Sequence, residues 1–172
     1  SVEKWWEFVK KAGHCVELRA IAPDKTIVCG HFDEQAAFLQ AVTKLHGRAN
    51  VYSSISPVPI AFLALGANVL NGDWKAVRLG LVDEGAGTPT CTKDSDVEFE
   101  AILGIDIDAE RKPAEVAATD EELAEARKVA DAVCGELKGR GLTIARGMSG
   151  NGYYVLVPTR LQAMTPEVVR HR

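Results

Sequence analysis

Two neighbouring stretches near the amino terminus alternate between apolar and polar residues, which predicts a β-hairpin. The first covers residues 15–21, and the second covers residues 26–32 after a Pro23-Asp24 turn. Ahead of the hairpin, the aromatic and aliphatic residues of positions 2–12 recur at helical spacing up to Gly13. The pattern therefore predicts a helix followed by two antiparallel strands.

Further elements follow before residue 97. Asp33 is a favourable N-cap for a helix carrying Ala37, Phe38, Val42 and Leu45, which we expect to end near Gly47. Residues 49–54 predict a strand, and the apolar residues 60–70 predict a buried helix. Gly, Thr, Asp and Pro dominate residues 80–96, so this stretch is predicted to be a long loop. Loops of this length in compact domains are usually either functional or disordered.

The second half begins with an apolar strand at residues 101–108. A capping box at residues 119–122 then opens a long helix that ends by Gly141. Its predicted apolar stripe consists of Leu123, Ala126, Val129, Ala130, Val133 and Leu137. Strands at 142–146 and 153–157 flank an Asn151-Gly152 turn, and residues from 165 onward are expected to begin another helix.

Strand, long helix and hairpin form the opening half of a ferredoxin-like or RRM-like sheet. We therefore predict an α/β (α+β) fold in two modules. Residues 1–97 would form an αβ module packed on the sheet of residues 98–172, and we expect that second module to be incomplete at its carboxyl end.

Composition narrows the function classes only slightly. The chain has 172 residues, 47% of them hydrophobic and 26% charged, with a net charge of −4. The negative net charge excludes a basic surface over the whole protein, so any nucleic-acid contact must be made by local clusters of Lys and Arg. The four cysteines form no CxxC pair and indicate free thiols in a reducing cytoplasm. No apolar run reaches the roughly 18 residues that span a bilayer, so we expect a cytoplasmic protein without a membrane partner.

The main candidate functional residues lie at the end of the predicted strand 101–108. Asp106 and Asp108 project to one face because residues i and i+2 of a strand point the same way. Two close carboxylates repel each other unless a cation lies between them, and oxygen ligands suit Mg²⁺ or Mn²⁺. The alternative is a strand end whose acids pair with nearby Arg111 and Lys112.

Several stretches resemble the archaeo-eukaryotic primase superfamily, in particular the primase-polymerase domains of phages, plasmids and mobile elements. The strongest are residues 104–113 (Gly-Ile-Asp-Ile-Asp-Ala-Glu-Arg-Lys-Pro), 118–122 (Ala-Thr-Asp-Glu-Glu) and 149–154 (Ser-Gly-Asn-Gly-Tyr-Tyr). Residues 17–19, 50–57 and 92–96 are also similar to that group. The resemblance extends from about Glu17 to Pro158.

The resemblance implies roles for particular residues. Asp106 and Asp108 would be catalytic and would bind two divalent metal ions, Mg²⁺ or Mn²⁺, which activate the primer hydroxyl and neutralise the triphosphate. The hairpin residues and one arginine would bind the incoming nucleotide: Ser149, Gly150, Asn151, Gly152, Tyr154 and Arg111. Apart from the resemblance, Arg19, Lys93 and Arg146 would be either solvated ion-pair partners or, as basic residues near an acidic metal site, further phosphate contacts.

The sequence departs from the family pattern at two points. Tyr154 stands where the family has a histidine, and tyrosine carries no positive charge at neutral pH. The family's third acidic motif has no counterpart up to Arg172, so we expect it either to follow in a longer chain or to be missing.

The resemblance implies a DNA primase/polymerase domain that makes or extends primers by template-directed nucleotidyl transfer. Its partners would be nucleoside triphosphates, a single-stranded DNA template or primer, and a fused or recruited helicase. The alternative is a catalytically incomplete module that binds nucleotides or single-stranded nucleic acid in a replication protein, and a third is a structural domain of a replication assembly.

Separately, His14-Cys15 facing Cys29-x-His31 would make a zinc site, although that spacing matches no known zinc finger.

Overall fold

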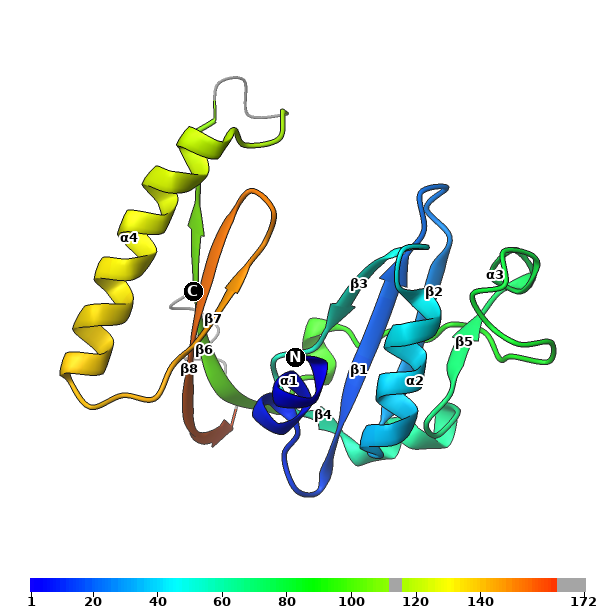
Figure 1. Cartoon of the computed structure of the whole chain (residues 1–172). Helices are drawn as coiled ribbons and strands as arrows, with labels where there is room; N and C mark the ends of the chain where they lie inside the picture. Colours follow the sequence, from blue (N-terminus) through cyan, green and yellow to red (C-terminus); the bar gives the residue numbers. More distant parts are fainter. Residues whose placement is uncertain (112–115, 164–172) are drawn as a thin grey trace. The chain divides into compact units, whose positions relative to one another are not determined.

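The computed structural model describes residues 1–111 and 116–163, which divide into two compact units (Figure 1). One unit is Ser1–Glu100 and the other is Ala101–Arg160, with the end of strand β8 grouping with the first. Helices and antiparallel sheet are present in the chain, which places the fold in the α+β class. The predicted boundary after residue 97 lies close to this division.

The first unit is built on a five-stranded antiparallel sheet. Its strands are β1 (His14–Ile21), β2 (Ile27–Phe32), β3 (Asn50–Ser53), β4 (Val58–Pro59) and β5 (Leu70–Gly72). The order is β3-β1-β2-β5, and β4 pairs with β1. The predicted hairpin of β1 and β2 is confirmed, with Glu17 opposite His31 and Arg19 opposite Cys29.

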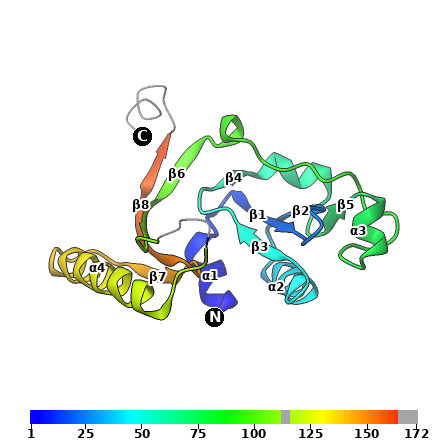
Figure 2. The ribbon, with the colours of Figure 1, turned by 90° about the horizontal axis from the view of Figure 1, so that it is seen from above.

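One face of this sheet is apolar and packs against helices. Helices α1 (Val2–Val9) and α2 (Gln35–Leu45) contact each other, and α2 lies along the sheet (Figure 2). Phe38 of α2 meets Phe32 of β2 edge to face at 5.8 Å between ring centroids, and it meets Trp6 at 5.0 Å. These buried rings are the centre of the first core.

The opposite face of the sheet carries polar side chains. Side chains alternate between the faces of a strand, so Glu17, Arg19, Cys29 and His31 share the face that α2 does not cover. The 3₁₀-helix η1 (Ile60–Leu65) contributes Phe62, whose ring lies 4.9 Å from that of His31. Residues of the long loop also contact this face.

Two predictions in this unit are wrong. Residues 60–70 do not form a buried helix, because η1 ends at Gly66, whose φ of 139° interrupts helical geometry, and none of its residues is buried. Asp33 is not the N-cap of α2. Glu34 has that position, and the Asp33 carboxylate instead accepts a hydrogen bond from Asn68 Nδ2 at 2.7 Å.

The predicted long loop is observed, and two short elements that the sequence pattern did not indicate lie at its two ends. Helix α3 (Trp74–Arg78) precedes it and is capped by the Asp73 side chain. The 3₁₀-helix η2 (Asp94–Asp96) lies at its end. Both are too short to produce a hydrophobic period.

The second unit contains a three-stranded sheet and one long helix. Its elements are β6 (Phe99–Asp108), α4 (Asp120–Gly139), β7 (Ala145–Met148) and β8 (Gly152–Ala163). The strand order is β6-β8-β7, as expected for strand, helix and hairpin. The predicted capping box is confirmed, because Thr119 and Glu122 each accept from the other's backbone N–H.

Two local predictions in this unit need correction. The buried residues of α4 are Ala126, Ala130 and Cys134, whereas Val129 of the predicted stripe is exposed. The turn of the hairpin uses Gly150, with a φ of 91°, and Gly152 is already the first residue of β8. The helix predicted from residue 165 lies outside the described residues. None of the helices in the described ranges is long and apolar enough to cross a membrane.

Candidate functional site

The predicted acidic pair lies at the end of β6. Asp106 and Asp108 are both exposed, while Ile105 and Ile107 between them are half-buried, so the strand alternates as predicted. Neither carboxylate has a hydrogen bond or ion pair with any described residue. The alternative interpretation has the pair neutralised by Arg111 and Lys112. The Arg111 guanidinium instead donates to Val116 O, and Lys112 lies outside the described residues.

The hairpin lies directly against this acidic end. Ala109 N donates to Asn151 O at 3.0 Å. A Cβ built on Gly152 would lie 2.9 Å from Asp108 Cα and closer still to the carbonyl oxygen of Ile107. Only glycine therefore permits β8 to approach β6 at this point.

This close approach gives a direct test of the packing. Gly152→Ala should lower the free energy of unfolding by about 3 kcal/mol, because the neighbouring atoms are backbone and cannot turn aside. The matched control is Gly135→Ala in α4, where nothing lies near the added methyl group and helix propensity should add about 0.5–1 kcal/mol. Urea unfolding followed by circular dichroism measures both. Equal effects of the two substitutions would contradict the observed approach.

The predicted nucleotide-binding residues of the hairpin differ in their surroundings. Asn151 stabilises the fold, since its backbone oxygen accepts a hydrogen bond from Ala109 N and its Oδ1 accepts one from Ala118 N. Gly150 is open, with no atom within 4 Å of a Cβ built on it. Ser149 is exposed and its N–H donates to Gly152 O. The structure thus brings these residues next to the acidic pair, with Gly150 the most approachable.

Tyr154 and Arg111 are the remaining predicted contacts. Arg146 lies opposite Val155 and forms an ion pair with Asp131 of α4, so Arg146 and Val155 share the face of the sheet that α4 covers. Tyr154 is the neighbour of Val155 in the strand, and its side chain therefore points to the opposite face. Tyr154 is substantially exposed. The buried Nε of Arg111 has no hydrogen-bond partner among the described residues.

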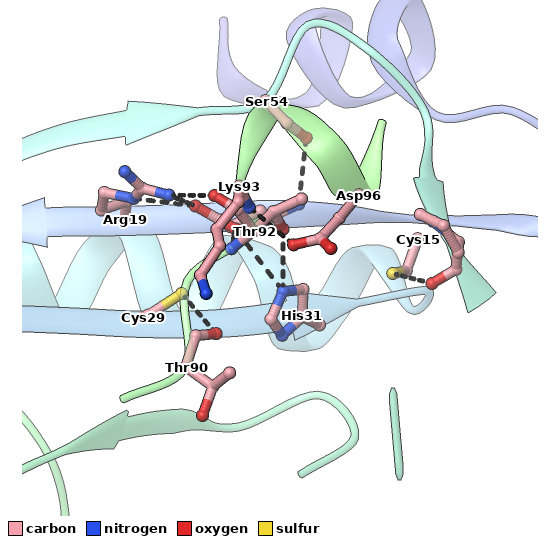
Figure 3. A network of polar contacts seen from close by, with 11 residues as sticks. Cys15, Arg19, Cys29, His31, Ser54, Thr90, Thr92, Lys93 and Asp96 are labelled. Carbon is pink, nitrogen blue, oxygen red and sulfur yellow. Dashed lines mark hydrogen bonds and ion pairs between the residues drawn. The ribbon is translucent and has the colours of Figure 1, made fainter. Parts of the chain in front are cut away.

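A second polar cluster, which the sequence did not reveal, lies on the polar face of the first unit (Figure 3). The Glu17 carboxylate accepts from Arg19 Nε at 2.9 Å and from Thr92 N at 2.5 Å. His31 Nε2 is 3.5 Å from Glu17 Oε2 and 3.2 Å from Thr92 Oγ1. Arg19 Nη2 donates to Thr92 O at 2.9 Å. Glu17 and His31 are almost completely buried.

These contacts set the ionisation of Glu17. Burial by itself would raise its pKa, but the hydrogen bonds from His31 and Thr92 and the charge of Arg19 outweigh burial and lower the pKa to about 2. The carboxylate is therefore charged at neutral pH. The cluster borders a pocket of about 450 Å³ whose lining includes Arg19, Tyr52, Ser54 and Lys93.

The sequence offered one partial signal of this cluster. Glu17 and Arg19 stand at i and i+2 in an apolar strand, which predicts a charged pair on one face. The contributions of His31 and Thr92 depend on strand register and on a loop far along the chain. The alternative of a zinc site made by His14-Cys15 facing Cys29-x-His31 is not observed, because the strand register places Glu17 opposite His31 and Arg19 opposite Cys29. Cys15 Sγ donates to Pro59 O, and Cys29 lies instead with Glu17 and Cys91, their ligand atoms within 4.8 Å of one another.

No family model, curated protein or solved structure matches the chain.

Proposed function

We propose that the chain is a primase-polymerase catalytic domain that transfers nucleotides to a primer on a single-stranded template. The observation that carries the proposal is the exposed Asp106–Asp108 pair, which has no partner among the described residues and lies beside the hairpin of residues 149–152. The resemblance of residues 104–113 and 149–154 to archaeo-eukaryotic primases supports the same reaction. The cofactor would be Mg²⁺ or Mn²⁺.

The donor set fits these hard cations. Carboxylate oxygens are the ligands that Mg²⁺ and Mn²⁺ prefer, and both carboxylates are exposed rather than committed to ion pairs within the described ranges. Asp106 and Asp108 would hold the metal ions. When bound, such ions activate the attacking hydroxyl and neutralise charge on the triphosphate.

The chain's own groups would position the nucleotide. The open backbone at Gly150 allows a phosphate to approach, and a glycine with positive φ can turn its amide toward an anion. Strands β6 and β8 run in opposite directions (Figure 1), and Ala109, which follows the first, is hydrogen-bonded to Asn151, which precedes the second. Three residues back from Ala109 is Asp106, and three residues on from Asn151 is Tyr154, so these two residues lie opposite each other. The Tyr154 hydroxyl would donate a hydrogen bond there. Arg111 would supply positive charge, since its Nε has no partner among the described residues.

A second candidate function is a binding module without turnover. Tyr154 favours it, because the corresponding histidine of the family would bring a charge to the triphosphate that tyrosine lacks. Such a module would still bind a metal–nucleotide complex or single-stranded DNA in a replication protein.

The experiment that tests the site is calorimetric titration of a nucleoside triphosphate in the presence of Mn²⁺. The parent chain should bind, and the Asp106→Asn, Asp108→Asn double variant should bind at least about 100-fold more weakly, since even the residues that support a metal ligand contribute 10–100-fold. The matched control is Glu125→Gln, an exposed acid on α4 paired with Lys128. Equal binding by the parent and the double variant would contradict a nucleotide site at the acidic pair.

A further inference from the structure

Two cysteines and one glutamate gather on the polar face of the first unit, away from the acidic pair in sequence and in a different unit. The Sγ atoms of Cys29 and Cys91 and a carboxylate oxygen of Glu17 all lie within 4.8 Å of one another. Cys29 is on β2 and Glu17 on β1, while Cys91 is in the long loop. Three ligand atoms from three segments thus point to one place.

The loop is held so that the Cys91 thiol meets this face. Thr90 O accepts from Cys29 Sγ at 3.4 Å, and Thr92 N and O bond to Glu17 and Arg19. The residues on either side of Cys91 are therefore fixed to β1 and β2 (Figure 3). Cys91 is only half-buried, which leaves a path to solvent.

The charges of the cluster balance with a divalent cation. Two thiolates and the Glu17 carboxylate carry three negative charges, and a divalent cation together with Arg19 carries three positive charges. Arg19 lies opposite Cys29 in the strand pairing, and its Nη2 donates to the carbonyl oxygen of Thr92, the residue after Cys91. Burial above all, with Glu17 and Cys91 nearby, raises the pKa of the Cys29 thiol.

We propose that Glu17, Cys29 and Cys91 form a binding site for a thiophilic divalent metal ion, of which Zn²⁺ is the natural representative. Two sulfur ligands and one carboxylate are a donor set for Zn²⁺, with water completing the tetrahedron. On binding, both thiols lose their protons to solvent and no electron is transferred. The hydrogen bonds from Thr92 and His31 hold the Glu17 carboxylate in position, as such contacts do for metal-ligating carboxylates.

The bound ion would fasten the loop to the sheet. Thr92, Lys93 and Asp94 follow Cys91 directly and line the pocket beside Arg19. A metal bridge from Cys91 to β1 and β2 would fix that wall of the pocket. This inference goes beyond the proposed nucleotidyl transfer and does not depend on it.

Co²⁺ is the probe for the test, because thiolate coordination gives it charge-transfer absorption and tetrahedral geometry gives it intense visible bands. The titration is done in a phosphine-reduced sample of the Asp106→Asn, Asp108→Asn variant, which removes the acidic pair as a competitor. We expect one equivalent of Co²⁺ to produce both signals, and Zn²⁺ to displace it and abolish them.

Substitutions locate the ion. Cys91→Ala should weaken Co²⁺ binding at least about 100-fold and remove part of the charge-transfer absorption, because one thiolate is lost. Cys91 is a half-buried loop residue, so this variant is expected to fold. Cys134→Ala, the same change at a buried position on α4, should leave the titration unchanged. Co²⁺ binding without thiolate absorption, or unchanged by Cys91→Ala, would overturn the proposal, as would a mass spectrum showing Cys29 and Cys91 joined in a disulfide that resists the phosphine.

Discussion

Asp106→Asn and Asp108→Asn are each expected to lower nucleotide incorporation by more than about 100-fold. Each substitution keeps the size of the side chain but replaces a charged metal ligand by a neutral amide. In the proposed reaction the metal ions supply most of the charge stabilisation of the transition state, so the loss should fall on turnover. The measurement is extension of a labelled primer on a single-stranded template with Mn²⁺ and nucleoside triphosphates.

The fold should be unaffected by these two changes. Both carboxylates are exposed and lack partners among the described residues, so each variant should unfold within about 0.5 kcal/mol of the parent. Glu125→Gln serves as the control that removes an exposed carboxylate elsewhere in the same unit. Incorporation retained by both Asp106→Asn and Asp108→Asn would refute the catalytic proposal. Metal-dependent nucleotide binding by a parent chain that never extends a primer would support the binding-module alternative.

Glu17→Gln is expected to lower the free energy of unfolding at pH 7 by about 3 kcal/mol. The carboxylate is buried and accepts hydrogen bonds from Thr92 and Arg19, and removing one partner of a buried charged cluster leaves the Arg19 charge uncompensated. The lowering of the Glu17 pKa from 4.5 to about 2 corresponds to a similar energy, roughly 3 kcal/mol. Urea unfolding followed by tryptophan fluorescence reports on this unit, which contains all three tryptophans.

The effect should depend on pH in a defined direction. Because the pKa of Glu17 is lower in the folded state, the stabilisation is complete above its unfolded value of 4.5 and is lost as the pH falls toward 2. The difference between the parent and Glu17→Gln should therefore shrink by about 2 kcal/mol between pH 7 and pH 3. Glu125→Gln, on the exposed face of α4, should change stability by less than about 0.5 kcal/mol throughout. A Glu17→Gln effect that stays constant with pH would contradict the low pKa.

Local patterns in the sequence predicted the elements whose geometry depends on near neighbours. The capping box of Thr119 and Glu122 was predicted because its bonds close within one helical turn. The outward projection of Asp106 and Asp108 follows from the two-residue repeat of a strand. The hairpin of β1 and β2 required only alternation and a short turn, and its prediction was also correct.

Predictions that required knowledge of a distant partner were less successful. Apolar spacing places Val129 on the inner side of α4, but the buried line runs through Ala126, Ala130 and Cys134, because the surface against which a helix packs selects the face. The apolar composition of residues 60–70 predicted a buried helix, yet the chain forms η1, ends it at Gly66 and then adds β5 to the edge of the sheet.

The sequence by itself determined the α+β class, the order of the main elements and the common face of Asp106 and Asp108, since each depends on residues a few positions apart. Only the tertiary structure decided the cluster around Glu17. His31 reaches Glu17 through the register of two strands, and Thr92 reaches it from 75 positions away in the sequence. Such contacts depend on the packing of the whole sheet and loop. A charge that is buried away from water is costly unless it is paired and hydrogen-bonded, so the fold places these partners around the Glu17 carboxylate.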